Sequence, residues 1–250
     1  MPVKTAISFG LVHIPVELNP VIKNNDTSFN MLHKKCLNRI KYQKVCPYCK
    51  TEVETKDLVK GYEYSKDEYV IFDDNDFDKL KTDNDTSMEI IAFVNLREVD
   101  PVYFDKSYYL STKGNNKAFS LFKKALEKEN KVAIAKTVLR DKSYYMLLRF
   151  GKGNILANTL YYEEEIFIDE NSTKDEFNKQ EMDLAIKLIN SMSDTFKPET
   201  YKDDYQDKIK EAISLKIDGK EIKKKRSKKQ ENVKDLMEAL EKSIKAKEKK

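Results

Sequence analysis

The chain has 250 residues, of which 40% are hydrophobic and 36% are charged, and it contains 14 tyrosines and 12 phenylalanines. So many aromatic residues exclude a disordered chain, and no apolar run reaches the roughly 18 residues that a membrane helix needs. The N-terminus lacks an apolar segment followed by a cleavage site, so we expect a charge-covered cytoplasmic protein of one large or two small domains.

The net charge of +4 is unevenly distributed along the chain. From Lys208 to the C-terminus there are 16 Lys and Arg against 8 Asp and Glu, whereas the preceding residues carry 31 against 35. Any surface that binds a polyanion within residues 1–207 must therefore come from a local cluster of cations.

Short segments rich in β-branched and aromatic residues predict a mainly β core. The first segment, from Ile7 to Val16, is expected to be one largely buried strand, with Pro15 at its edge or its end. Six more segments share this composition and are expected to be strands, at residues 68–72, 88–94, 101–110, 131–139, 144–150 and 155–162.

Tight turns separate the last of these segments. Residues 141–143 and 151–154 have the composition of such turns, so the last three strands are expected to form a meander. Many short strands at this spacing favour a barrel or a sandwich over a parallel sheet.

Apolar residues at helical spacing predict three helices, at residues 119–126, 182–196 and 209–216. Asn130, Pro198 and the pair Asp218-Gly219 are expected to end these helices in turn. A basic linker with few apolar residues follows, and it has no reason to fold.

The tail after this linker carries one more apolar stripe, with Asn232 as a candidate N-cap. A helix this short is marginal alone, so it needs a partner that buries the stripe. The stripe consists of Val233, Leu236, Met237, Leu240 and Ile244.

A His-x-x-Cys pair and a Cys-x-x-Cys pair are separated by nine residues: His33 with Cys36, and Cys46 with Cys49. This donor set is of the zinc type, because a two-residue spacer lets both side chains of a pair reach one ion. The alternative is a turn that contains a Cys-x-x-Cys beside an unrelated Cys36. A thioredoxin-like redox role is disfavoured, because no βαβ pattern follows.

The segment between these two pairs is basic and alternates in polarity. In a strand, Arg39 and Lys41 would lie on one face. A solvated face is the ordinary explanation of a charge run, but here the surrounding core is net acidic, so the cluster predicts binding of a polyanion. Nearby lysines extend it: Lys34, Lys35, Lys44 and Lys50.

Two segments resemble motifs for calcium or phosphate binding, but neither has the residues that the motif requires. Residues 74–78 resemble the start of a calcium loop, but Lys79 stands at the position that requires glycine. Residues 151–153 lack the spacing of a phosphate loop. Of the two histidines, His13 lies in a predicted strand and His33 in the candidate metal site, so nothing in the sequence requires an enzyme.

Blocks spread along nearly the whole chain resemble the prokaryotic Ku family. They are ISFGLVHIPVEL at 7–18, LHKKC…RIKYQKVCPYC at 32–49, VKGYEY at 59–64, VDPVYFDKSYYL at 99–110, KAFSLFKKALEKENKVAIAKTVLR at 117–140 and FKPETYKDDY at 196–205.

The resemblance implies a homodimer whose β-barrel cores carry extended arms that close into a ring around a linear DNA duplex at its broken end. It also implies recruitment of an ATP-dependent DNA ligase, ligase D, for non-homologous end joining. The implied fold class is mainly β with helical additions (α+β). The expected divisions are a Ku core at 1–200 with a bridge arm at about 30–64, a helical dimerisation arm at 201–222, and a basic linker with a tail helix at 223–250.

Two features depart from the family pattern. The tryptophan expected before the first strand is missing, and the chain contains no tryptophan at all. The basic C-terminal extension is short, which predicts weak sliding inward along DNA.

A ring of this kind assigns roles to the basic residues. The first arm is expected to supply most DNA contacts, through Lys34, Lys35, Arg39, Lys41 and Lys44. The later meander is expected to add Lys136, Arg140, Arg149 and Lys152. A structural Zn²⁺ would brace the arm, and the tail stripe would dock the ligase or DNA-bound neighbours. The alternative is a zinc-ribbon module in transcription or RNA binding, and a nuclease acting at ends is a third reading.

Overall fold

The chain was analysed as a computed structural model, which describes residues 2–80, 87–139, 142–167, 178–222 and 236–248. It divides into two units: Met1–Asn24 with Asn30–Ile168, and Asn25–Phe29 with Asp169–Lys250.

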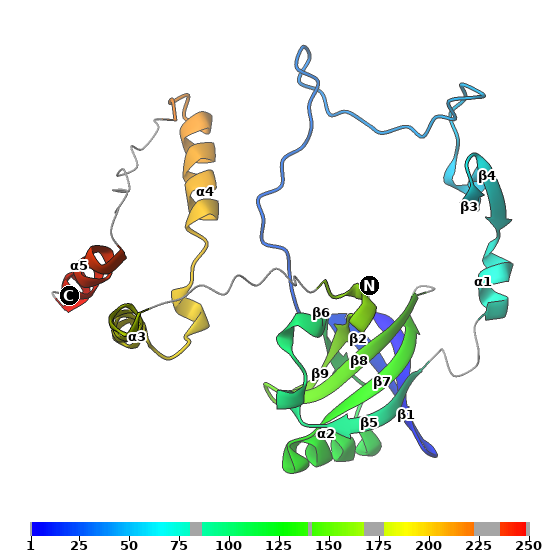
Figure 1. Cartoon of the computed structure of the whole chain (residues 1–250). Helices are drawn as coiled ribbons and strands as arrows, with labels where there is room; N and C mark the ends of the chain where they lie inside the picture. Colours follow the sequence, from blue (N-terminus) through cyan, green and yellow to red (C-terminus); the bar gives the residue numbers. More distant parts are fainter. Residues whose placement is uncertain (1, 81–86, 140–141, 168–177, 223–235, 249–250) are drawn as a thin grey trace. The chain divides into compact units, whose positions relative to one another are not determined.

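The described strands of the first unit close into a barrel (Figure 1). β1 and β5 run parallel, and the other neighbouring pairs are antiparallel. The predicted barrel is thus confirmed. Around the barrel the order is β1 (Val3–Phe9), β2 (Val12–Pro20), β6 (Phe104–Ser111), β9 (Asn154–Leu160), β8 (Lys142–Gly151), β7 (Val132–Leu139) and β5 (Met88–Val94).

The prediction of one strand from Ile7 to Val16 is wrong, because the chain reverses at Gly10 and forms the β1–β2 hairpin. Gly10 has a φ of 55°, which glycine adopts without steric cost. Pro15 is paired with Ala6 inside β2, but the pairing of β2 with β6 begins only at Glu17. Pro15 therefore needs no N–H donor on the side away from β1.

One end of the barrel is sealed by α2 (Lys117–Glu129), which lies across it (Figure 1). The helix begins at Asn116, whose side chain accepts the N–H of Phe119 at 3.0 Å, and it ends at Asn130 in the left-handed conformation, as predicted. Its buried residues join Ile7, Ile14, Met146 and Leu148 in the barrel core, and they are Phe119, Phe122 and Leu126.

The two ends of the barrel can be named from β1, which runs from one to the other. Val3 lies at the end where β2 finishes at Pro20, and we call this the arm end. Phe9 lies at the other end, beside Val12, and the Phe9 ring packs in a tilted arrangement against Phe122 of α2 at 5.4 Å between ring centroids. We call this the helix end.

Residues 21–80, here called the arm, leave the barrel after β2. The arm contains the hairpin β3 (Lys60–Ser65) and β4 (Glu68–Phe72), followed by α1 (Asp74–Leu80). α1 starts where the Asp73 carboxylate accepts the N–H of Asp76 at 2.9 Å, so the acidic run opens a helix. No residue of the arm is buried.

The second unit is helical, with α3 (Lys179–Met192), α4 (Asp204–Ile217) and α5 (Leu236–Glu248). α3 ends at Met192, before the predicted end at Pro198, and Pro198 instead opens the short turn Pro198–Thr200. α4 stops at Asp218 and Gly219, as predicted. None of the described helices is long and apolar enough to span a membrane.

Candidate nucleic-acid interface

The arm contains two turns of the same construction, thirteen residues apart in the sequence. In the first, Leu37 donates its N–H to the His33 carbonyl at 2.8 Å, and Leu32 pairs with Arg39. In the second, Lys50 donates to the Cys46 carbonyl at 2.8 Å, and Val45 pairs with Glu52. The fifth residue of each turn, Leu37 or Lys50, has a φ of 55°.

Each turn brings its own pair of predicted metal ligands together. His33 Nδ1 lies 3.2 Å from Cys36 Sγ, and the Cys49 N–H points at Cys46 Sγ at 3.5 Å. The backbone N–H groups of Cys49 and Tyr48 lower the pKa of the Cys46 thiol, so the turn favours a thiolate, the form that binds metal.

The two pairs remain separate in the structure. Across the described ranges, no three His, Cys, Asp or Glu side chains gather where they could hold one metal ion. The chemistry of the donors nevertheless fits zinc, because the side chains are one imidazole and three thiols. The zinc site therefore stays a prediction.

The predicted basic strand between the turns is wrong. Arg39 takes part in a single β-bridge, and residues 40–44 form no regular secondary structure. The backbone bonds of the two turns stop at Ile40 on one side and at Lys44 on the other, and no described segment pairs with residues 41–43. The cations are exposed, and they are Lys34, Lys35, Arg39, Lys41 and Lys44.

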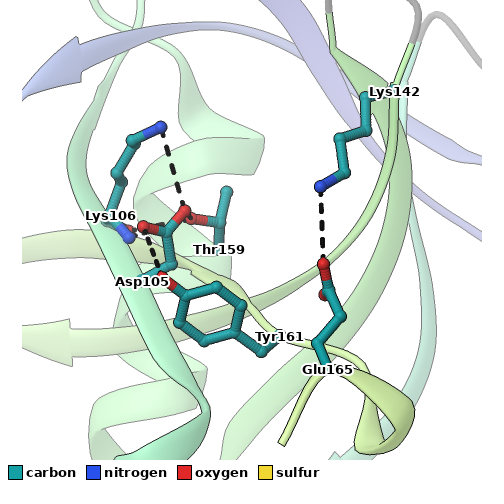
Figure 2. A network of polar contacts seen from close by, with 6 residues as sticks. All are labelled: Asp105, Lys106, Lys142, Thr159, Tyr161 and Glu165. Carbon is teal, nitrogen blue, oxygen red and sulfur yellow. Dashed lines mark hydrogen bonds and ion pairs between the residues drawn. The ribbon is translucent and has the colours of Figure 1, made fainter.

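The arm end of the barrel contains a cavity of about 340 Å³, which Pro20 at the root of the arm helps to line. A polar network anchors its rim (Figure 2). The Thr159 hydroxyl, almost fully buried, donates to Asp105 Oδ2 at 3.1 Å and accepts the Lys106 N–H at 2.9 Å. The Tyr161 hydroxyl donates to the other oxygen of Asp105 at 3.4 Å. Asp105 is thus held in place from inside the barrel.

Two lysines extend from this rim. Lys106 Nζ lies 4.0 Å from Asp105, and Lys142 Nζ lies 3.5 Å from Glu165 (Figure 2). The lysine side chains remain 67% and 57% exposed, respectively. Exposed ion pairs of this kind contribute at most about 1 kcal/mol, so both ammonium groups can exchange their carboxylates for a phosphate.

Glu165 is also fixed by the backbone. The Tyr162 N–H donates to it at 2.9 Å, and this bond, followed by Lys142, lowers the pKa of the carboxyl group. The carboxylate therefore stays ionised near neutral pH and keeps Lys142 at the arm end. Sequence reasoning missed both lysines, because the strand pattern gives no signal that distinguishes them from other exposed lysines.

The structure separates the cations predicted on the meander. Lys136 is exposed on β7 opposite Tyr145, whereas Lys152 lies in the turn at the helix end. Arg149 is half-buried, and its Nε donates to the Asn158 side chain at 3.3 Å. Arg140 lies outside the described residues.

The predicted docking stripe of the tail is partly covered. α5 packs against α3, and Met237, Leu240 and Ile244 are half-buried. Leu236 opens the helix, and Val233 lies outside the described residues.

Two other surfaces stay apolar and exposed. On α3, one stripe remains 47–65% exposed and is formed by Met182, Ile186, Ile189 and Met192. On the arm hairpin, Tyr62 and Val70 are cross-strand partners on one face, and Ile71 lies on the other; all three are exposed. A two-stranded hairpin is marginally stable alone. Here Phe72 packs on Phe77 of α1, and the exposed Tyr62, Val70 and Ile71 leave further apolar surface for a partner.

Comparison with known proteins identifies the family. A family model described as the Ku70/Ku80 beta-barrel domain matches residues 8–184. Three relatives carry the name "Non-homologous end joining protein Ku". The protein of Lachnoclostridium phytofermentans is 42% identical, covering 96% of this chain and 95% of the relative. That of Desulfitobacterium hafniense is 38% identical, covering 96% and 86%, and that of Bacillus subtilis is 34% identical, covering 96% and 80%. With this match over the barrel and nearly the whole length, the chain belongs to the Ku family.

Proposed function

We propose that the protein binds double-stranded DNA ends in non-homologous end joining, as a homodimer whose arms close a ring around the duplex. The names of its relatives support the pathway. The main structural support for a DNA contact is the arm. It starts after β2, and the next strand of the barrel after it is β5; β2 and β5 are the two neighbours of β1 in the barrel. Because no arm residue is buried, its stability depends on what it binds.

The proposed contacts are with phosphates. The arm supplies Lys34, Lys35, Arg39, Lys41 and Lys44, and the barrel supplies the exposed Lys136. Arg149, which is bonded to Asn158, and Lys152, which lies at the helix end, are no longer proposed as DNA contacts. We add Lys106 and Lys142 at the arm end. Side chains that contact phosphates position a duplex without reading its sequence, so the protein binds any end, and its affinity falls steeply with salt.

A structural zinc ion, held by His33, Cys36, Cys46 and Cys49, would join the two repeated turns. Each turn already orients two donors, so closure requires only that the turns approach each other. The ion would supply rigidity to a segment without a core. It would take no part in catalysis, and we propose no enzymatic activity for the chain.

The proposal of a homodimer is based on the exposed apolar surface of α3. α3 has one half-buried stripe, formed by Leu184, Ala185 and Leu188, and a second stripe that stays exposed. A helix that is apolar on two sides is normally buried on two sides. Sedimentation without DNA is expected to give a dimer, and a monomer would contradict this part of the proposal.

The tail helix is proposed to dock an ATP-dependent DNA ligase of the ligase D type. Its stripe is only half-buried on α3, so a partner can compete for it. Deletion of residues 228–250 is expected to leave binding of DNA ends intact and to reduce stimulation of ligation. Loss of DNA binding with normal stimulation would contradict the assignment.

Competition between linear and closed DNA tests the function itself. In a gel shift with a linear duplex, linear fragments are expected to compete and closed circles of the same sequence to compete far less, because a ring requires an end for loading. Equal competition would refute end loading and would favour a zinc-ribbon nucleic-acid module. Metal-dependent shortening of the DNA would instead indicate a nuclease.

A further inference from the structure

The helix end of the barrel carries an apolar groove of about 540 Å³ between α2 and the strands. Phe93 of β5 and Leu121 of α2 line it and are 50% and 68% exposed. Its charged lining residues are Glu129 and Lys131. A contiguous apolar surface with a polar rim is typical of a protein interaction site, whereas single exposed apolar residues are ordinary.

The shape of the groove follows from the faces of α2. One face carries Phe119, Phe122 and Leu126 into the barrel core. The neighbouring face carries Ala118, Leu121 and Ala125, all exposed and all lining the groove. Because the two alanines are small, the helix backbone lies open on both sides of Leu121. Such a surface accepts the side-chain ridge of another helix.

A basic stripe borders this face. Lys117, Lys124 and Lys128 are spaced at i, i+7 and i+11, so they share one side of α2, next to Leu121. All three are exposed, and none lies within 4.0 Å of a carboxylate in the described part of the chain. The groove therefore presents apolar surface beside three lysines that form no ion pair within the described residues.

We propose that this groove binds an acidic amphipathic helix of a partner protein. Apolar side chains of that helix at i, i+3, i+4 and i+7 would fill the space between Leu121 and Phe93. Its carboxylates would face Lys117, Lys124 and Lys128. Since the groove lies at the opposite end of the barrel from Pro20, the partner and a ligand of the arm end can be bound at the same time.

Charge complementarity favours such a partner over another copy of this chain. α3 carries two acidic residues and two lysines, and α4 and α5 each carry three of both, so none of these helices is acidic overall. α1 is acidic but has only seven residues, and its Phe77 already packs on Phe72 at 5.6 Å between centroids.

The test uses the full chain and two labelled synthetic peptides of about five helical turns. Both peptides carry the same apolar stripe, and they differ only in flanking residues, which are Glu in one and Lys in the other. By fluorescence anisotropy, the acidic peptide is expected to bind at least tenfold more tightly. Equal binding of the two peptides, or binding of neither, would overturn the proposal.

Variants locate the binding site. Ala125→Glu is expected to abolish binding of the acidic peptide, and Ala125→Phe, which fills the hollow without adding charge, to reduce it at least tenfold. The triple variant Lys117→Gln, Lys124→Gln, Lys128→Gln is expected to remove the preference for the acidic peptide. Glu127→Gln on the other side of α2 is the matched control and is expected to change nothing.

Two outcomes would assign the groove differently. If Ala125→Phe leaves peptide binding unchanged, the peptide binds elsewhere and the proposal fails. If Ala125→Phe or Ala125→Glu shifts the sedimentation coefficient of the protein alone, the groove is covered by a second copy, and the proposal is again overturned.

Discussion

The two ends of the barrel are built from the same strands and have opposite surfaces. At the arm end, Lys106 and Lys142 stand over an open cavity, each beside a carboxylate that the fold holds in place. At the helix end, α2 seals the barrel and leaves an apolar groove bordered by lysines without carboxylate partners in the described structure. We propose that one end contacts the phosphates of DNA and that the other binds a protein.

On these proposals, one small barrel would serve two ligands. A strand that crosses the barrel, such as β1, contributes Val3 to the cavity at one end and Phe9 to the groove at the other. The two ligands would therefore not compete for surface.

The largest expected effect concerns stability at the helix end. Phe122 is buried under α2, so Phe122→Ala is expected to lower the free energy of unfolding by about 3–5 kcal/mol. Lys142→Gln at the open arm end is expected to change it by less than about 0.5 kcal/mol. Urea denaturation of both variants measures this contrast, and similar losses would mean that α2 does not seal the core.

Among the variants that affect DNA binding, reversal of charge in the arm is expected to lower the affinity most. Arg39→Glu combined with Lys41→Glu replaces two phosphate contacts by two repulsions, so affinity for a linear duplex is expected to fall on the order of 100-fold at moderate salt. Gel shifts at several salt concentrations give both the affinity and the salt slope. Unchanged end binding would remove these residues from the interface.

A smaller effect is expected from the arm end of the barrel. Lys106→Gln combined with Lys142→Gln is expected to weaken end binding about tenfold and to lower the salt slope by about two per chain. The matched control, Lys124→Gln with Lys128→Gln, removes the same charge at the helix end and is expected to leave end binding within about twofold. Equal losses in both double variants would indicate a general charge effect and would erase the contrast between the ends.

Metal removal is expected to have the smallest effect, because zinc would act only through the order of the arm. Dialysis against a chelator, or Cys46→Ser, is expected to weaken end binding roughly threefold to tenfold and to increase hydrogen exchange in residues 32–52. Barrel amides are expected to keep their protection. Metal analysis that finds no zinc in the purified protein would exclude the site.

Most strands of the barrel were predictable from the sequence, because they are short, apolar and separated by turns, whereas the choice of a barrel over a sandwich came from the resemblance to the Ku family. The predicted strand at 88–94 matches β5, and the predicted turn at 151–154 matches the left-handed pair Lys152 and Gly153. The first hairpin was missed because apolar alternation continues through Gly10 and places Leu11, which is fully exposed, at the tip.

The candidate sites were predictable only in part. The spacing of His33, Cys36, Cys46 and Cys49 predicts two pairs of donors, and the repeated turns agree with it. Spacing alone does not show that Leu37 and Lys50 take the same left-handed conformation, or that residues 40–44 between the turns form no strand. The arm-end network joins Asp105 to Thr159, residues far apart in the sequence, so only the strand register reveals it.

The central claim is that DNA contacts the arm and the arm end of the barrel but not the helix end. Lysine footprinting tests this claim most directly, since it measures the accessibility of lysines at both ends in one sample. The protein is acetylated with and without a linear duplex, and the reactivity of each lysine is measured by mass spectrometry. Protection of Lys106, Lys142 and the arm lysines, with Lys117, Lys124 and Lys128 still reactive, is the expected result. Protection of the α2 lysines while Lys106 and Lys142 stay reactive would contradict the assignment of DNA to the arm end.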